Sequence, residues 1–371
     1  MDPRHVYIHV PFCARRCSYC DFSIAVRQDV PHGEYLAALE RELSIRAAVL
    51  DNWLVETLYL GGGTPSRLGG VGVSEVIGVI RARAQIDETG EITVEANPED
   101  VSPQAVSAWR DAGVNRLSIG AQSFDERALE WMHRTHTARQ TRDAVATARA
   151  EGIHEVSLDL IFAVPESLDR QLERDLDAAL ELAPQHVSVY GLTVEPRTPL
   201  ARWRDRGAVR EAPEERYEEE FLLTHERLTA AGFEHYEVSN YALPGHRARH
   251  NSSYWGRSPY LGFGPSAHSF DGRRRRWNVA PYVTWARQLA FGVDPIEADE
   301  LLTADEEAAE RVYLGLRTVE GIADLPPARE RAARWQDAGW AVIESGRLRL
   351  TAAGWLRLDA IAADLTLVGS R

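Results

Sequence analysis

Short apolar segments alternate with longer helix-forming segments through the first two-thirds of the chain. The apolar segments are rich in β-branched residues and end in turn residues, which predicts strands over 6–10, 57–60, 92–96, 116–120, 156–162 and 186–190. The segments between them are rich in Ala, Leu, Glu and Arg, which predicts helices over 34–49, 73–84, 103–112, 141–151 and 168–182. Strands that alternate with helices predict a parallel sheet with right-handed crossovers.

These six units are too few to close an eight-stranded barrel. The predicted fold is therefore α/β, an open partial (β/α)6 barrel, and a doubly wound sheet is the competing architecture. The pattern changes after residue 193. Residues 213–231 are helical in pattern, and residues 244–271 are rich in Gly, Pro and aromatic side chains with little periodicity.

The C-terminal part has its own pattern. Two helical stretches follow residue 303, and a short apolar hairpin over 340–350 turns at Ser345-Gly346 before a last helix. This order predicts a winged-helix-like α+β appendage. The predicted domains are a partial barrel at 1–232, a linker or cap segment at 233–298 and the appendage at 299–371.

Composition and charge exclude several classes of function. The 371 residues carry a net charge of -14 with a pI near 5.4, which argues against nucleic acid as a partner. The chain contains no lysine, so all 42 basic residues are arginine, which excludes Schiff-base chemistry and the P-loop lysine. No apolar run reaches the roughly 18 residues that span a bilayer, and the first strand begins too early for a signal peptide. A cytosolic protein is expected.

Cys13, Cys17 and Cys20 are the only cysteines, and they directly follow the first predicted strand. Three thiolates are one ligand short of a closed four-ligand site, which leaves a metal position open for chemistry. A [4Fe-4S] cluster on three cysteines has a free iron that can chelate S-adenosylmethionine, and this spacing is typical of radical-SAM proteins. The alternatives are a zinc site completed by His9 or His32, or three incidental thiols.

Polar residues also stand where the other predicted strands end, at the edge where parallel sheets bind ligands. A glycine loop, Gly61 to Pro65, follows the second strand and allows close approach to a ligand. Asp159 lies in an otherwise apolar strand, where a carboxylate is costly to bury unless it is paired, and Glu95 stands at the end of the third strand. Both could bind the ammonium and ribose of S-adenosylmethionine, and Arg134 its carboxylate. Alternatively, Arg134 is a surface charge and Asp159 pairs with a core arginine.

The chain resembles the HemN/HemW branch of the radical-SAM family. The resemblance covers nearly the whole chain and rests on residues 7–22 (YIHVPFCARRCSYCDF), 61–65 (GGGTP), 94–98 (VEANP), 118–124 (SIGAQSF) and 158–162 (LDLIF). It implies that the three cysteines bind the cluster and that S-adenosylmethionine is bound by Tyr7, Gly62, Gly63, Thr64, Glu95, Gln122, Arg134 and Asp159. Ala163-Val164-Pro165 departs from the usual Gly-Leu-Pro, which puts the shape of the adenine pocket in doubt.

Within this branch the choice lies between an enzyme and a haem carrier. The oxygen-independent coproporphyrinogen dehydrogenases have a further cysteine where this chain has Phe22, and an N-terminal extension that this sequence lacks. The segment His250-Asn251-Ser-Ser-Tyr254-Trp255 resembles the HNxxYW motif of the haem chaperones. The resemblance therefore implies a haem-binding protein that delivers haem to haem-requiring respiratory proteins at the inner face of the membrane. Coproporphyrinogen decarboxylation or a HemN-like radical methyl transfer is the alternative.

In that interpretation His250 offers an imidazole to the haem iron, supported by the aromatic surfaces of Tyr254 and Trp255. Arg247 and Arg249 lie nearby for the propionates. Without the resemblance, the same segment would be a loop histidine with two aromatics that cap the barrel. The run Arg273 to Arg276 could attract haem propionates or an acidic partner, but because it follows Asp271-Gly272 it is expected to be a solvated turn, and no function is assigned to it.

Overall fold

The structure is a computed structural model that describes residues 3–47, 50, 52–323 and 329–366. Its largest sheet has 12 strands in the order β14-β13-β12-β11-β1-β4-β5-β6-β7-β8-β10-β9. The middle six are parallel, and they are β1 (His5–Val10), β4 (Leu54–Gly62), β5 (Gln85–Ala96), β6 (Arg116–Gln122), β7 (Glu155–Phe162) and β8 (His186–Gly191). All six predicted strands are thereby confirmed.

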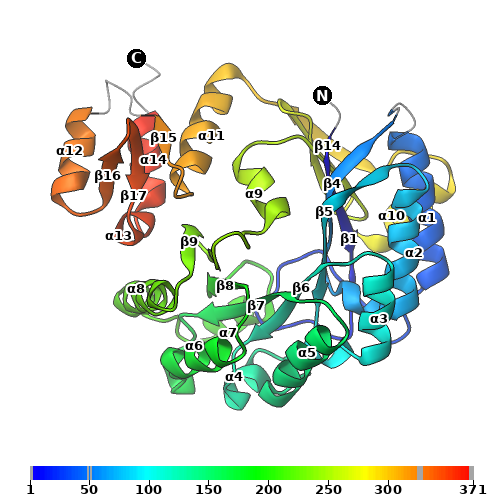
Figure 1. Ribbon diagram of the computed structural model, residues 1–371, viewed down its shortest axis with the longest axis horizontal. Coiled ribbons are helices and arrows are strands. Elements are labelled where there is room, and N and C mark those ends of the chain that lie inside the picture. Colours follow the sequence, from blue (N-terminus) through cyan, green and yellow to red (C-terminus); the bar gives the residue numbers. More distant parts are fainter. Residues whose placement is uncertain (1–2, 48–49, 51, 324–328, 367–371) are drawn as a thin grey trace.

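Helices follow the convex outside of this curved sheet (Figure 1). The crossover helices are α1 (His32–Arg46), α2 (Gly69–Arg81), α3 (Pro103–Asp111), α5 (Ala138–Ala150) and α6 (Leu172–Glu181). Helices on one side of a curved, unclosed parallel sheet make an open partial barrel, which confirms the predicted fold class over the doubly wound alternative. The predicted end of the first helix at 48–49 lies outside the described residues.

Local sequence signals explain where several helices begin. The Ser102 hydroxyl accepts a hydrogen bond from the Ala105 amide at the start of α3. Thr137 and Gln140 form a reciprocal capping box at the start of α5. Shorter elements that the sequence pattern did not reveal are α4 (Glu126–Trp131), α7 (Pro199–Asp205), β2 (Phe12–Cys13), β3 (Ala25–Val26) and three 3₁₀ turns, Pro65–Leu68, Pro98–Asp100 and Glu166–Leu168.

The sheet is extended at both edges by the segment predicted as a linker or cap. Beyond β8 come β10 (Asn240–Ala242) and β9 (Glu234–Glu237), which follow the helix α8 (Glu214–Ala230). Beyond β1 come β11 (Tyr260–Phe263), parallel to β1, and then the antiparallel β12 (His268–Phe270), β13 (Arg274–Asn278) and β14 (Ile296–Leu301), with α10 (Tyr282–Ala290) between the last two. The helix α9 (Arg249–Trp255) connects the two edges.

Residues 244–271 are therefore more regular than their sequence pattern suggested. They contain α9, β11 and β12, each of three to seven residues. Elements of this length are too short to show a helix or strand period.

The expectation of a solvated turn at Arg273 to Arg276 was wrong for most of the run. Asp271 does make the turn, because its Oδ1 accepts hydrogen bonds from the amides of Arg273 and Arg274. The following arginines belong to β13, which is antiparallel to the acidic strand β14. Arg274 pairs with Asp299, and Arg276 pairs with Asp294 at 2.7 Å. Charge neutralisation by acidic partners distant in sequence lets this run form a strand.

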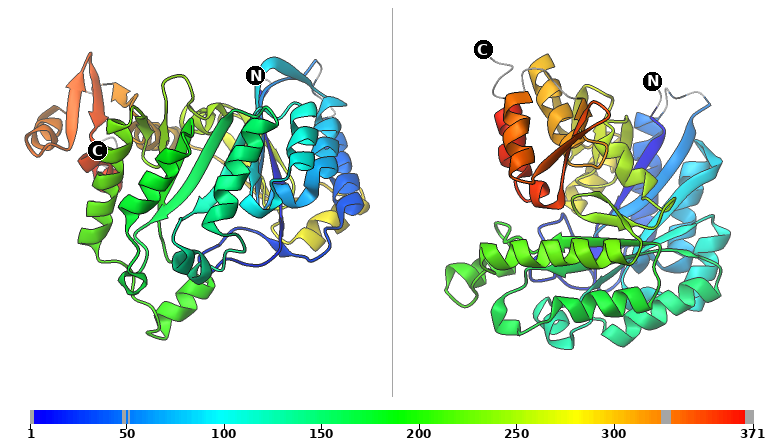
Figure 2. Two further views of the ribbon diagram at one scale, coloured as in Figure 1. Left: turned by 60° about the horizontal axis from the view of Figure 1, so that its bottom comes forward. Right: turned by 60° about the vertical axis from the view of Figure 1, so that its left-hand side comes forward.

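The C-terminal part packs beside α8 and β9 (Figure 2). It contains α11 (Ala304–Leu316), α12 (Arg329–Asp337), α13 (Ala352–Trp355), α14 (Leu358–Thr366) and a sheet in the order β15 (Ile322–Ala323), β17 (Arg347–Leu350), β16 (Ala341–Glu344). The predicted hairpin is confirmed, and its turn residues Ser345 and Gly346 both have positive φ. The proposed domain limits remain predictions. Among the described residues, no helix is long and apolar enough to cross a membrane.

Candidate functional site

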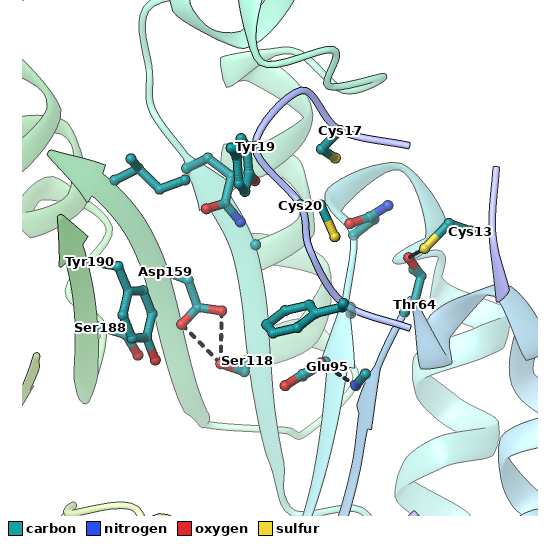
Figure 3. Close-up of a pocket in the computed structure, with 18 of the residues that line it drawn as sticks. Cys13, Cys17, Tyr19, Cys20, Thr64, Glu95, Ser118, Asp159, Ser188 and Tyr190 are labelled. Atoms are coloured by element: carbon teal, nitrogen blue, oxygen red, sulfur yellow. Dashed lines mark hydrogen bonds between the residues drawn. The ribbon is translucent and has the colours of Figure 1, made fainter. Parts of the chain in front are cut away.

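A cavity of about 410 Å³ opens at the carboxyl ends of the parallel strands (Figure 3). Alternation along each strand turns every second side chain into the barrel, so polar residues at these positions face one space. The residues predicted from sequence that line this cavity are Cys13, Cys17, Cys20, Gly62, Gly63, Thr64, Glu95, Gln122, Arg134 and Asp159. Tyr7, His250, Tyr254 and Trp255 do not line it.

The cysteine loop runs between β2 and β3 over one side of the cavity. Cys13 is buried and its Sγ lies 3.4 Å from the Thr64 hydroxyl, while Cys17 Sγ lies 3.5 Å from Arg134 Nη1. Burial raises the pKa of the Cys13 thiol, and burial raises that of Cys20 to about 12. Thiols desolvated in this way become thiolates when a metal takes the place of the proton.

The zinc alternative does not fit this geometry. Among the described residues, no three His, Cys, Asp or Glu side chains converge as ligands of a single metal ion. His9 Nε2 is hydrogen-bonded to the Ser23 carbonyl at 2.9 Å, and His32 Nε2 pairs with Glu75 at 2.9 Å. In a cubane each cysteine binds a different iron, so the thiols need not converge on one point. The donor set, three thiols on one loop beside a cavity, fits such a cluster.

Glu95 lies at the end of β5 with both carboxylate oxygens engaged. Oε1 accepts a hydrogen bond from the Tyr59 hydroxyl at 2.8 Å, and Oε2 accepts one from the Gly62 amide at 3.0 Å. Burial raises the pKa of Glu95 to about 7, although these two donors oppose the shift. A cationic ligand would stabilise the charged form of this buried carboxyl group, because its charge offsets the free-energy cost of desolvation.

Asp159 faces the same space from β7. Both carboxylate oxygens lie 3.1 Å from the Ser118 hydroxyl, and Ser188 also hydrogen-bonds the carboxylate. Burial raises the pKa of Asp159 to about 6. In the described part of the chain no arginine forms a close ion pair with Asp159, although the charges of Arg116 and Arg134 oppose the upward shift of its pKa.

Arg134 reaches into the cavity rather than into solvent. Its Nη2 donates to Asn97 Oδ1 at 2.6 Å and to the Gly120 carbonyl at 3.0 Å, and its buried Nε has no partner among the described residues. Gln122, which also lines the cavity, has a left-handed backbone with φ of 64° at the end of β6. The surface-charge alternative for Arg134 is therefore not supported.

Close packing against β1 requires glycine at two positions of the loop at the end of β4. A Cβ at Gly62, where φ is 109°, would lie 2.5 Å from the His9 ring, and one at Gly63 would lie 2.6 Å from the Pro11 carbonyl. Only glycine permits this approach, which brings the loop against β1 beside Cys13 and Thr64.

The segment around His250 differs from the cysteine loop because its polar groups are closed off. His250 is 1% exposed. Its Nδ1 lies 2.7 Å from the Thr57 hydroxyl, and its Nε2 lies 2.7 Å from the Tyr254 hydroxyl. Burial lowers the pKa of His250 to about 3, so the imidazole is neutral. Both ring nitrogens are occupied, and neither faces the cavity in this conformation.

The aromatic neighbours of His250 form a packed stack. Tyr7 stacks on Tyr59, which in turn stacks on His250 with ring centroids 5.1 Å apart. The Tyr7 hydroxyl lies 3.2 Å from His9 Nδ1. Trp255 lies under the guanidinium of Arg317, 4.4 Å from the ring centroid, at the C-terminal part of the molecule.

Sequence reasoning missed several residues that line the cavity. Figure 3 shows Tyr19, Ser188 and Tyr190 beside the predicted residues. Arg116, Ser118 and Asn251 line it as well. Ser118 and Arg116 stand two and four residues before Gly120 on the same strand, so period-two alternation could have identified them. No such signal exists for Asn251, which reaches the cavity from α9.

The fold and the cysteine loop define the class of this protein. Residues 7–179 match the Radical SAM superfamily. The fold is also that of the solved coproporphyrinogen III oxidase HemN from Escherichia coli, with a TM-score of 0.82, 23% identity, and coverage of 98% of this chain and 89% of that one. The protein is thus a radical-SAM protein.

More similar relatives define the family within this class. The chain is 40% identical to the heme chaperone HemW of Mycobacterium tuberculosis (strain ATCC 25618 / H37Rv), over 98% of this chain and 95% of that protein. It is 35% identical to the heme chaperone HemW of Bacillus subtilis (strain 168), over 86% of this chain and 84% of that protein. The chain therefore belongs to the HemW family of radical-SAM proteins.

Proposed function

We propose that this protein is a haem chaperone, which binds haem together with an S-adenosylmethionine-ligated [4Fe-4S] cluster and delivers the haem to haem-requiring proteins. The observation that carries the proposal is similarity to proteins named heme chaperone HemW over nearly the whole chain, at 40% identity. The HNxxYW segment at 250–255 agrees with it.

Cys13, Cys17 and Cys20 would hold the cluster. When bound, the cluster supplies an open iron site that chelates the amino and carboxylate groups of S-adenosylmethionine. The support is that the three thiols line one cavity together with the carboxylates and the arginine that suit such a ligand.

S-adenosylmethionine would lie along the strand ends. Glu95 and Asp159 would bind its ammonium and ribose hydroxyls, and Arg134 would bind its carboxylate. Thr64, Gln122 and the glycines of the loop would contact it through hydroxyl, amide and backbone groups. Tyr7 would act indirectly, because it stacks on Tyr59, which lines the cavity. The raised pKa values of both carboxyl groups support the assignment, because a cationic ligand would favour their charged forms.

His250 would act in haem uptake, with Tyr254 and Trp255 in support. Because both of its ring nitrogens are hydrogen-bonded, we propose that in this conformation His250 orders α9. Ligation of haem iron by His250 Nε2 would require the Tyr254 hydroxyl to move away. The acceptors we propose are haem-requiring respiratory proteins, reached at the inner face of the membrane.

One anaerobic experiment tests the chaperone against the enzyme. The reconstituted protein is incubated with reductant, S-adenosylmethionine and either coproporphyrinogen or haem. We expect stable haem uptake, followed by Soret absorbance, transfer to an apo-cytochrome, and no porphyrin decarboxylation. If the protein consumes coproporphyrinogen, its function is oxidative decarboxylation and not haem delivery. If it transfers a methyl group and retains no haem, its function is that of a radical-SAM methyltransferase.

The variant His250→Ala separates haem uptake from the rest of the site. We expect it to take up less haem while the cluster and the affinity for S-adenosylmethionine stay unchanged, because His250 does not line the cavity. The matched control is His154→Ala, which removes an exposed imidazole. Equal haem uptake and transfer by both variants would remove His250 from the carrier role.

A further inference from the structure

The wall of the cavity nearest the amino ends of the strands carries an arginine whose charge is only partly compensated. Arg116 is 5% exposed and lines the cavity. Its Nη1 donates to the His246 carbonyl at 3.2 Å, whereas its buried Nη2 has no hydrogen-bond partner among the described residues. A buried guanidinium nitrogen without an acceptor is costly, so this position favours a ligand oxygen.

The acidic groups around Arg116 do not accept a hydrogen bond from its Nη2. Glu155 is the nearest, with Oε2 3.7 Å from Nη1, but its two oxygens lie 2.8 and 2.9 Å from His246 Nδ1. Asp159 is held by Ser118 and Ser188. Neither carboxylate forms a hydrogen bond with Arg116 Nη2.

Two polar residues of the cavity lining near the start of β7 and β8, Ser157 and His186, carry no charge. Ser157 and His186 line the cavity and are hydrogen-bonded to each other, with Oγ 2.8 Å from Nδ1, and His186 Nε2 lies 2.8 Å from the Tyr236 hydroxyl. Burial, and next the charge of Arg116, hold the pKa of His186 well below its usual value, so this imidazole is neutral. Arg116 is therefore the cation of this group.

Asn251 lines the cavity from α9, and among the described residues its side-chain amide makes no hydrogen bond. It is the member of the HNxxYW segment that reaches this space, whereas His250 is closed off behind it. An amide donor and a guanidinium together suit a planar, singly charged acceptor. A dianion such as phosphate is disfavoured, because Glu95 and Asp159 line the same cavity.

We propose that Arg116 forms a subsite for a ligand carboxylate in the interior of the cavity, which Asn251 and Ser157 also line. This inference rests on the proposed function, which supplies two ligands with carboxylates. We assign the subsite to a haem propionate, because the carboxylate of S-adenosylmethionine is already assigned to the cluster iron and Arg134. S-adenosylmethionine is the competing source in the test. Arg247 and Arg249, which the sequence suggested for the propionates, lie outside the cavity lining; Arg247 pairs with Glu234, and Arg249 donates to the Thr89 carbonyl.

The test compares haem with its dimethyl ester, which lacks both carboxylates. We expect the wild-type protein to bind haem about tenfold or more tightly than the ester, since a hydrogen bond to a charged group contributes roughly 1.5–3 kcal/mol. Arg116→Gln should remove this preference by weakening haem binding and leaving ester binding unchanged. Asn251→Asp, which places a negative charge at the subsite, should also weaken haem binding more than ester binding.

Two variants serve as controls. Arg249→Gln removes a nearby guanidinium outside the cavity and should keep the preference for haem. Arg116→Lys retains a positive charge and should keep part of it. Because Arg116 also donates to the His246 carbonyl, the thermal unfolding of each variant is recorded, and the Lys variant distinguishes loss of charge from loss of fold.

Calorimetry with S-adenosylmethionine on the same variants separates the two sources. If Arg116→Gln weakens binding of S-adenosylmethionine about tenfold while the haem preference persists, the subsite holds the carboxylate of S-adenosylmethionine. If Arg116→Gln changes neither ligand, or if Arg249→Gln alone abolishes the preference for haem, the subsite is rejected. A wild-type protein that binds neither haem nor ester refutes the proposed function, and the calorimetry still decides the subsite.

Discussion

The cysteine side of the cavity and the segment around His250 are two regions that the sequence marked as functional, and the structure treats them in opposite ways. Around the cavity, the thiols form no disulfide, Arg134 Nε has no partner among the described residues, and the carboxyl groups of Glu95 and Asp159 have raised pKa values. Around His250 every polar group of the ring is satisfied within the protein. Unsatisfied buried groups indicate a ligand, whereas a closed hydrogen-bond network indicates a structural support.

The strongest test of this difference is removal of a thiol. Cys13→Ala, Cys17→Ala or Cys20→Ala should each abolish the cluster after anaerobic reconstitution, because in the proposed site each thiolate would bind its own iron and the sequence has no further cysteine. Iron and sulfide content and visible absorption measure the loss. Ser18→Ala is the matched control in the same loop, since its buried hydroxyl has no partner among the described residues and the three thiols remain. A triple variant that keeps full iron and sulfide content would contradict the cluster assignment.

The next effect concerns the carboxylates. Glu95→Gln and Asp159→Asn should weaken binding of S-adenosylmethionine by roughly ten- to hundredfold, because loss of a charge-assisted contact costs about 1.5–3 kcal/mol. Calorimetry on the reconstituted variants measures this, with cluster content unchanged. Glu88→Gln, an exposed carboxylate on the same strand as Glu95, is the control. If the affinity for S-adenosylmethionine is unchanged in both variants, Glu95 and Asp159 do not contact this ligand and have a structural role, as the hydrogen bonds of His250 do.

In the closed region around His250, a substitution should lower the free energy of unfolding of the protein. His250→Ala removes a buried ring and its two hydrogen bonds, and it leaves the Tyr254 hydroxyl without its partner, while the Thr57 hydroxyl keeps His5 Nδ1 at 2.9 Å. The free energy of unfolding should therefore fall by about 1–3 kcal/mol. Tyr254→Phe loses one of these hydrogen bonds and should cost less. Urea unfolding of the apo-protein measures both changes. A stability equal to the wild type in His250→Ala would show that this network contributes nothing to holding α9.

The last effect is a pH dependence of stability. The pKa of Glu95 is raised from 4.5 to about 7, so between these values the folded apo-protein binds more protons than the unfolded chain. The contribution of Glu95 to the free energy of unfolding must therefore decrease as pH rises from about 4.5 to about 7. Urea unfolding across this range should show a shallower decrease for Glu95→Gln than for the wild type. An identical pH dependence in both proteins would show that the buried carboxyl group is not protonated in this range.

Much of the barrel could be predicted, because each parallel strand carries its own run of β-branched residues and each long helix its own period. The elements that escaped prediction, such as β2, β3, β12 and α4, are two to six residues long. β13 escaped for another reason, because its arginines form a strand only when the acidic residues of β14 lie beside them.

The sequence by itself determined the alternating α/β class, the cysteine spacing and the residues that meet at the strand ends, because these are local patterns or follow from parallel strands ending at one edge. Only the tertiary structure decided which side chains stay open to a ligand. In the HNxxYW segment, adjacent residues of one short helix differ: His250 is enclosed by Thr57 and Tyr254, and Asn251 lines the cavity. That choice depends on how α9 packs between the two edges of the sheet, which no spacing along the chain encodes.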